Sequence, residues 1–276
     1  MRSMRNLLFA LPLATFTVAC GGEPLDPTSP EATSPVVADE AVDQVEQRVG
    51  LHGPYNWHTS ANGYVSTSIG TATNRTCFLT GVSGNLQPPT GSSSWGSTGT
   101  FIFAGEWYIF VNHNFSKMLG STVECMTTSA NRTAEVSWYN GQPAKLLGAV
   151  TADRRCFLTM VEGAGAFDST SEYVRVWNDG LNWYLGGDLA SEGGGRALCV
   201  DVPESHGGWQ WISAGSGFSK DLAYDPGGVG CFLSGLGGRF NQNSLTDGLS
   251  IDYNSGTRTW EMTLSPAKRG WANCVK

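Results

Sequence analysis

The sequence CFLTGVSG at Cys77–Gly84 returns twice, as CFLTMVEG at Cys156–Gly163 and as CFLSGLGG at Cys231–Gly238. Each copy lies in the same setting, with one Trp before it, a second Trp after it and then a closing Cys. The leading tryptophans are Trp57, Trp138 and Trp211, the trailing ones are Trp107, Trp183 and Trp260, and the closing cysteines are Cys125, Cys199 and Cys274. Recurrence at a nearly fixed spacing predicts a structural unit that is present three times.

Short apolar runs fill each unit, and they favour strands over helices. Runs such as Trp107–Val111, Tyr173–Trp177 and Leu249–Tyr253 are rich in aromatic and β-branched residues, and Gly, Asn and Asp stand between them. Outside the N-terminal 50 residues, no window of 12 or more keeps the 3.6-residue period of an amphipathic helix. The sequence therefore predicts an all-β protein with about five short strands per unit.

The three units are placed at 51–128, 129–205 and 206–276. They predict pseudo-threefold packing, trefoil- or prism-like, and the alternative is three separate beads of about 75 residues that would each be marginal alone. A glycine stands seven residues after the first Cys of every unit, as Gly84, Gly163 and Gly238. Its recurrence predicts a turn or a bulge at a place where a side chain would clash.

Seven cysteines are present, and the units use six of them. Six cysteines allow 15 connectivities, and the symmetry of the units favours pairing within each one. The predicted disulfides are Cys77–Cys125, Cys156–Cys199 and Cys231–Cys274. Because the chain has no Cys-x-x-Cys and no histidine at a repeated position, we expect neither a metal site nor a cofactor.

The seventh cysteine, Cys20, ends an export signal. Residues 1–19 carry Arg2 and Arg5, then the apolar run Leu7–Val18, which is too short to span a bilayer. The end of this segment resembles the lipobox of bacterial lipoproteins, which implies lipidation of Cys20, and Gly21 resembles the outer-membrane sorting pattern of that class. We expect an outer-membrane or cell-surface lipoprotein; cleavage after Ala19 into a soluble secreted protein is the alternative.

Residues 20–50 read as an acidic tether rich in Pro, Ser and Thr, with a short helix possible over 36–49. This segment holds seven acidic residues and one basic residue, whereas residues 51–276 have a net charge of only −3. Since the folded part is nearly neutral and has no basic stripe, nucleic acid is not expected as a partner.

The motif Cys-Phe-Leu-Thr-Gly-Val-x-Gly, followed by Trp-Tyr-Leu and a closing Cys, resembles a repeat of uncharacterised secreted bacterial proteins, often found beside adhesive or tail-fibre-like modules. The resemblance covers about residues 75–276. The second unit fits best, with Trp183–Gly187 and Ala197–Val200, and the first departs from it through an insert at Gln87–Ser97. The resemblance implies an extracellular binding or structural role.

No convergent set of catalytic residues is evident, so no catalytic residue is assigned. Glu172 and Asp252 stand near equivalent strands and could form a glycosidase pair, although solvated strand faces explain them better. The run Glu192–Arg196 lacks the lysine and the helix of a phosphate-binding loop, and it reads as an ordinary loop.

Four tryptophans do not recur, and they are the predicted ligand contacts: Trp95, Trp177, Trp209 and Trp271. Three of them adjoin Gly-rich or Ser-rich stretches that read as loops, where a flat ring can contact a sugar or a protein. The favoured function is therefore a surface-anchored binding protein, adhesin- or lectin-like, that contacts carbohydrate or an envelope protein. The alternatives are a structural or assembly lipoprotein of the envelope and a secreted hydrolase.

Overall fold

A computed structural model describes residues 50–87, 95–202, 205–212, 218–225 and 227–276, with only the backbone of 205–212 and of Phe218. The predictions for the signal segment, Cys20, the tether and its short helix lie outside the described residues. So does most of the insert in the first unit.

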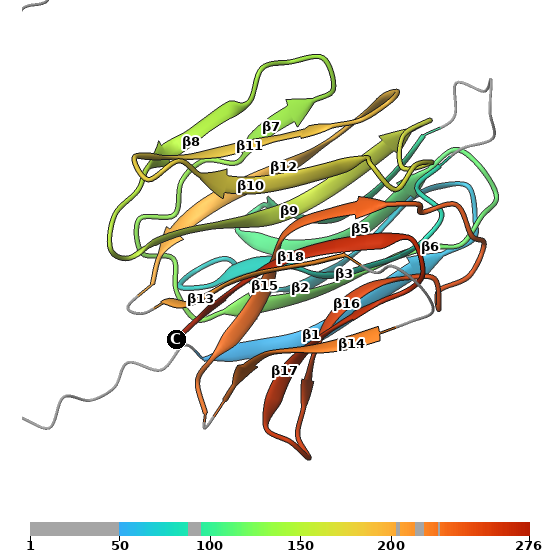
Figure 1. Ribbon diagram of the computed structural model, residues 1–276. Coiled ribbons are helices and arrows are strands. Elements are labelled where there is room, and N and C mark those ends of the chain that lie inside the picture. The colour runs from blue at the N-terminus through green and yellow to red at the C-terminus, as the bar shows by residue number, and fades with distance from the viewer. Residues whose placement is uncertain (1–49, 88–94, 203–204, 213–217, 226) are drawn as a thin grey trace, which may run out of the picture. The chain divides into compact units, whose positions relative to one another are not determined.

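The described chain forms three six-stranded sheets (Figure 1). In spatial order, the first sheet contains β1 (Leu51–Thr59), β6 (Leu119–Met126), β3 (Thr76–Gly84), β16 (Gly248–Asn254), β17 (Thr259–Leu264) and β14 (Phe218–Tyr224). The second contains β13 (Ser205–Ile212), β18 (Lys268–Val275), β15 (Gly230–Gly238), β10 (Tyr173–Asn178), β11 (Asn182–Asp188) and β8 (Lys145–Ala149). The third contains β2 (Gly63–Thr71), β5 (Glu106–His113), β4 (Gly96–Phe103), β9 (Arg154–Ala164), β12 (Glu192–Asp201) and β7 (Val136–Tyr139).

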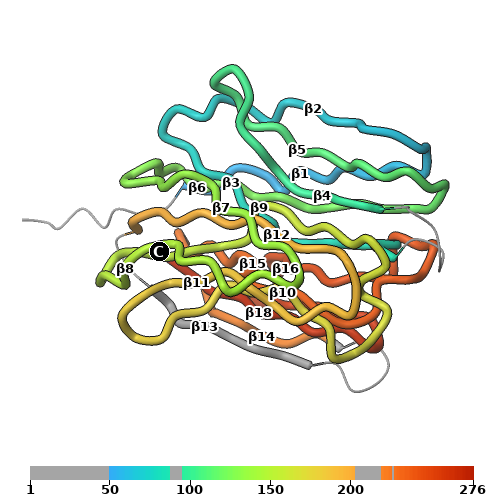
Figure 2. The backbone as a smooth tube through the Cα atoms, turned by 90° about the horizontal axis from the view of Figure 1, so that it is seen from above, coloured from blue at the N-terminus to red at the C-terminus, as the bar shows by residue number. Residues whose placement is uncertain are grey.

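The all-β prediction is confirmed, and each unit supplies six strands rather than about five. In every unit the first, sixth and third strands lie together in one sheet, while the fourth, fifth and second strands join the sheet of another unit. The junctions are the pairs β3–β16, β15–β10 and β9–β4. Figure 2 shows the result for β4, β5 and β2, which run together along one side of the molecule.

This exchange of strands means that the alternative of three separate beads is wrong. A unit cut out alone would leave its third and fourth strands each without one hydrogen-bonded neighbour and would expose the two edges at which these strands pair with other units. The strand order is equivalent in the three sheets, and a trefoil- or prism-like symmetry of the whole stays a prediction.

The Phe of each repeated motif lies at the centre of the core. Phe78, Phe157 and Phe232 are fully buried, and each ring contacts the other two. The ring centroids are 4.7 Å apart for Phe78 and Phe157, 5.5 Å for Phe78 and Phe232, and 5.2 Å for Phe157 and Phe232, in tilted or edge-on arrangements. Such geometry adds about 0.5–1.5 kcal/mol per pair to the free energy gained by burying the rings.

The predicted disulfides are confirmed. Each one joins directly opposite residues of the third and sixth strands of its unit, as Cys77–Cys125, Cys156–Cys199 and Cys231–Cys274. All six cysteines are fully buried. Three disulfides are consistent with an extracytoplasmic location, because such bonds persist in oxidising compartments.

A β-bulge recurs in the repeated motif, at its fourth residue and not at the glycine. The register shifts at Thr80, Thr159 and Ser234. The recurring glycine is nevertheless required for close approach: a Cβ on Gly84 would lie 2.2 Å from the Met118 carbonyl oxygen, and one on Gly238 would lie 2.1 Å from that of Ala267. The predicted clash is therefore confirmed, and the bulge lies four residues earlier, at a buried hydroxyl side chain in each unit.

The recurring tryptophans are core residues where their side chains are described. The trailing ones, Trp107, Trp183 and Trp260, are buried, as is Trp138, and Trp57 is half-buried. The indole Nε1 of Trp107 donates to the Arg75 carbonyl oxygen, and that of Trp260 donates to the equivalent carbonyl of Val229, both at 2.9 Å. The side chain of Trp211 lies outside the described part.

The phenylalanine cluster makes a prediction for stability. Replacing Phe157 by Ala should lower the free energy of unfolding by about 3–5 kcal/mol, as expected for a large ring removed from a close-packed core. Denaturant unfolding measures the loss. The control is Phe103→Ala, since Phe103 is 65% exposed and should cost less than about 1 kcal/mol. Equal losses in the two variants would contradict a central role for the cluster.

Candidate functional site

Six large side chains form a distinct surface on the second sheet, here called the arginine–aromatic face. Its members are Tyr173, Arg175, Trp177, Tyr184, Arg269 and Trp271. Alternation along β10 explains the face, because Val174 and Val176 point into the core and the residues between them point outward. Five of the six side chains are half-buried, and Trp271 is 8% exposed.

Arg175 lies at the centre of this face. Its guanidinium carbon is 5.4 Å from the ring centroid of Tyr173, 5.2 Å from that of Trp177 and 5.9 Å from that of Trp271. These distances fit cation–π contact with three rings. Trp177 also stacks on Tyr184, with centroids 5.9 Å apart and planes at 28°.

Glycines form the floor under the rings and the arginine. Gly235 on β15 lies opposite both Arg175 on β10 and Trp271 on β18. A Cβ there would lie 2.6 Å from the Arg175 Cβ and 2.9 Å from the Trp271 ring. On β11, a Cβ on Gly186 would lie 2.9 Å from the Trp177 ring. The absent side chains let both indoles lie low over the sheet.

Two of the four predicted contact residues, Trp177 and Trp271, meet on this face through Arg175. The expectation that Trp271 and Trp209 lie on loops is wrong, because they belong to β18 and β13, which are paired strands of the second sheet. The Trp209 side chain is outside the described part. Trp95 is half-buried just before β4, in the third sheet, where its backbone N–H donates to Asn114 Oδ1.

Sequence reasoning missed Arg175, Arg269, Tyr173 and Tyr184. The outward positions of the run YVRVW at Tyr173–Trp177 hold Tyr, Arg and Trp, which is an uncommon set for a solvated strand. That signal could have identified the β10 part of the face. The contribution of β18 depends on the order of the strands in the sheet, which the sequence pattern does not reveal.

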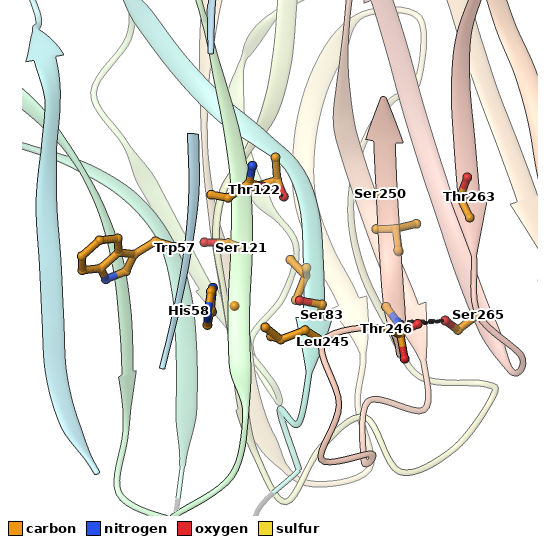
Figure 3. A pocket seen from close by; sticks show the side chains of 15 residues that line it. Trp57, His58, Ser83, Ser121, Thr122, Leu245, Thr246, Ser250, Thr263 and Ser265 are labelled. Atoms are coloured by element: carbon orange, nitrogen blue, oxygen red, sulfur yellow. Dashed lines mark hydrogen bonds between the residues drawn. The ribbon is translucent and has the colours of Figure 1, made fainter. Parts of the chain in front are cut away.

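A groove of about 420 Å³ occupies the corresponding side of the first sheet, between β1, β6, β3, β16 and β17 (Figure 3). Asn56, His58, Ser83, Thr122, Ser250 and Thr263 are among its lining residues, none of which is Asp, Glu, Lys or Arg. The Trp57 ring points away from the other labelled side chains (Figure 3). The groove is thus polar, uncharged and rich in hydroxyl groups.

Several of these hydroxyl groups already have partners within the protein. Thr122 Oγ1 donates to Asn56 Oδ1 at 2.7 Å, and Ser250 Oγ donates to the Asp252 carboxylate at 2.6 Å. Ser265 Oγ donates to the Thr246 carbonyl oxygen at 3.0 Å (Figure 3). The groove therefore offers fewer free hydrogen-bonding groups than its composition suggests.

Glu124 on β6 is buried close to this groove, two residues beyond Thr122, which lines it. Burial, together with the smaller effect of the nearby negative charge of Asp252, raises the pKa of the Glu124 carboxyl from 4.5 to about 7. Its Oε2 is buried without a hydrogen-bond partner in the described part of the chain.

The hypothesised carboxylate pair is not organised as a pair. Glu172 is buried, and its carboxylate accepts hydrogen bonds from the backbone N–H groups of Asp168, Ser169 and Ala190 at 2.6–2.8 Å. These bonds fix the turn before β10. Asp252 is exposed on β16 in the first sheet, whereas Glu172 precedes a strand of the second.

A third surface, here called the aromatic ladder, lies on β2, β4 and β5 of the third sheet. It consists of Tyr64, Phe101, Phe103, Tyr108 and Phe110, whose rings contact one another at centroid distances of 5.4–6.4 Å. Tyr64 is 51% exposed and Phe103 is 65% exposed. This surface is apolar and open to solvent.

Among the described residues, no three His, Cys, Asp or Glu side chains are grouped as a metal site would require. In the same part of the chain, no helix has the length and apolar character needed to cross a membrane. No protein-family model matches the chain, and no curated protein or solved structure is significantly similar to it.

The raised pKa of Glu124 predicts how the stability of the protein depends on pH. Its pKa is raised from the usual 4.5 to about 7, so the folded state holds this proton more tightly than the unfolded state. The free energy of unfolding should therefore fall by about 3 kcal/mol as pH rises from about 4.5 to 7. Glu124→Gln should lose this fall in a pH series of denaturation curves.

Glu106→Gln is the control, because Glu106 is exposed on β5. It should keep the pH dependence of the unchanged protein. An unaltered fall in Glu124→Gln would assign the effect to another group.

Proposed function

We propose that this protein is a surface-anchored, extracytoplasmic binding protein, adhesin- or lectin-like, which contacts carbohydrate through the arginine–aromatic face. The observation that carries the proposal is the arrangement of Tyr173, Trp177 and Trp271 around Arg175 above a floor of glycines, with Tyr184 stacked on Trp177. Flat rings with a polar neighbour suit the apolar face of a sugar together with its hydroxyl groups.

The proposal moves the ligand contacts from loops to strands. A site on paired strands is rigid, so its rings lose little conformational freedom when a ligand binds. Trp177 and Trp271 remain proposed contacts. Trp209 stays a prediction and is not assigned to this face, because in the register of β13 and β18 it lies opposite Ala272 and not opposite Trp271. Trp95 belongs to a different sheet and is not part of this face.

Export and anchoring are the second part of the proposal. The three disulfides, the apolar segment before Cys20 and the acidic tether together favour a lipoprotein held outside the cytoplasm. Two or three acyl chains would anchor it stably. Location in the outer membrane follows only from the resemblance at Cys20–Gly21.

A structural or assembly role in the envelope is the second candidate, and the aromatic ladder favours it. Contiguous exposed apolar surface is typical of contacts with another protein or a membrane. The groups that a hydrolase would use do not converge in the described residues, so this third candidate has the least support.

Trp177→Ala tests the binding proposal. With a glycan that the unchanged protein binds in an array of envelope polysaccharides, the affinity should fall about 30-fold, since a central aromatic contact contributes about 2 kcal/mol or more. Isothermal titration measures the affinity, and circular dichroism checks the fold.

The matched control is Tyr224→Ala, since Tyr224 is 61% exposed on β14 of the first sheet. It should bind as the unchanged protein does. Equal affinity of Trp177→Ala and the unchanged protein would remove the arginine–aromatic face from the proposal. No binding to any glycan would favour the assembly role.

Cys20→Ser tests the anchor. The unchanged protein should sediment with membranes and incorporate labelled palmitate, whereas the variant should lose the label and leave the membrane fraction. Sedimentation of the variant with membranes to the same extent as the unchanged protein would contradict anchoring through Cys20.

A further inference from the structure

The two arginines of the arginine–aromatic face have no anionic partner among the described residues. Neither Arg175 nor Arg269 forms an ion pair with any described residue, and the Nε atom of each is buried without a hydrogen-bond partner there. By contrast, Arg196 on the third sheet pairs with Glu135 at 3.3 Å. Within the described part of the chain, these two half-buried guanidinium groups therefore lack the counter-charge that buried cations need.

The register brings the two arginines onto one face. Arg269 lies opposite Gly237, and Gly237 lies opposite Tyr173, the residue two before Arg175. Residues that face each other in adjacent strands point to the same side of a sheet. Gly235 and Gly237 on β15 therefore lie between the strands of the two arginines, and neither has a side chain that could cover them.

Two acidic residues of the described part, Asp188 and Asp179, lie toward the β11 side of this face. Asp188 is exposed opposite Tyr173 on β11 and makes no ion pair with either arginine. Asp179 accepts a hydrogen bond from the Tyr184 hydroxyl at 3.1 Å and two more from backbone N–H groups of its own turn. The centre of the face is therefore positively charged, although the whole chain has a net charge of −7.

We infer that the arginine–aromatic face binds an acidic sugar, a uronic acid unit of a polysaccharide, with its carboxylate on Arg175. This inference rests on the proposed function and specifies the ligand class. A guanidinium group can bind a carboxylate through two parallel N–H···O bonds. The carboxylate would also supply the counter-charge that Arg175 lacks among the described residues. Trp177 and Tyr184, stacked beside Arg175, offer an aromatic surface for the C–H face of the same ring or of its neighbour.

Tyr173 and Trp271 hold the arginine for this contact. Their centroids are 5.7 Å apart, and both rings lie within 6 Å of the guanidinium carbon. A guanidinium held by rings is already oriented before the ligand arrives, so less freedom is lost on binding. A peptide carboxylate would use the arginine but would gain less from the flat rings beside it, so a sugar fits the face better.

The test compares an oligogalacturonate with its fully methyl-esterified form, by titration calorimetry on the full-length protein in detergent. The acid should bind at least 10-fold more tightly than the ester, and added salt should weaken the binding of the acid but not that of the ester. Arg175→Gln should abolish this preference while keeping residual binding of the ester. Arg175→Lys should restore part of the preference, since it keeps the charge but lacks the fork.

Arg258→Gln is the matched control, because Arg258 makes a cation–π contact with Tyr224 in the first sheet, with its guanidinium carbon 5.8 Å from the ring centroid. It removes the same charge and should keep the preference for the acid. Arg269→Gln gives a second reading if Arg175→Gln does not fold, and it should reduce the preference at least 3-fold.

Equal affinity for acid and ester, both weakened by Trp177→Ala, would overturn the acidic-sugar assignment and leave the binding function standing. Equal loss in Arg258→Gln and Arg175→Gln would also overturn it, because the effect would then be one of overall charge. Tighter binding of an oligoglutamate or of a sulfated galactan would overturn the uronate assignment in favour of that ligand. Failure of every saccharide to bind would remove the proposed function itself.

Discussion

The mutual contact of Phe78, Phe157 and Phe232 is the constraint on which the fold depends. These rings come from three repeats about 75 residues apart, and they are fully buried only because the repeats close around one point. Each ring is followed by a bulge at a buried Thr or Ser, and each lies beside a disulfide that ties its strand to the last strand of its unit. The core thus forms from three identical local arrangements.

The exchange of strands between repeats explains how one scaffold carries three different surfaces. The fifth residue of each repeated motif faces a residue on the fourth strand of another unit. This residue is Arg175 in the second sheet, Ser250 in the first and Gly99 in the third. The neighbouring equivalent positions hold Trp177, Asp252 and Phe101. Core positions recur because packing demands the same volume three times, whereas outward positions are free to diverge. The surface of the second sheet is therefore aromatic and cationic, that of the first sheet is polar and contains a groove, and that of the third sheet is apolar.

Placing the proposed contact residues on strands changes the kind of binding site that is proposed. The rings on the second sheet are backed by paired strands, so the proposed site would be formed before a ligand arrives. Its glycine floor matters as much as its rings, because a side chain at Gly235 or Gly186 would push the indoles or the arginine off the sheet. Such a flat, rigid and charged surface suits a polymer lying across the strands better than a small molecule in a closed cavity.

The sequence by itself determined the all-β class, the three units, the disulfide pairs and the burial of four of the six recurring tryptophans, because each of these follows from local pattern and from repetition. It also identified Trp177 and Trp271 as unusual, since they break the repetition. Only the tertiary structure decided that the units exchange strands, and this exchange brought the residues of the face together. Arg175 and Trp177 come from the second repeat, whereas Gly235 and Trp271 come from the third, and they meet only because β10 pairs with β15. Pairing between distant strands depends on complementary edges and on the closing of a shared core, and neither leaves a periodic signal in the chain.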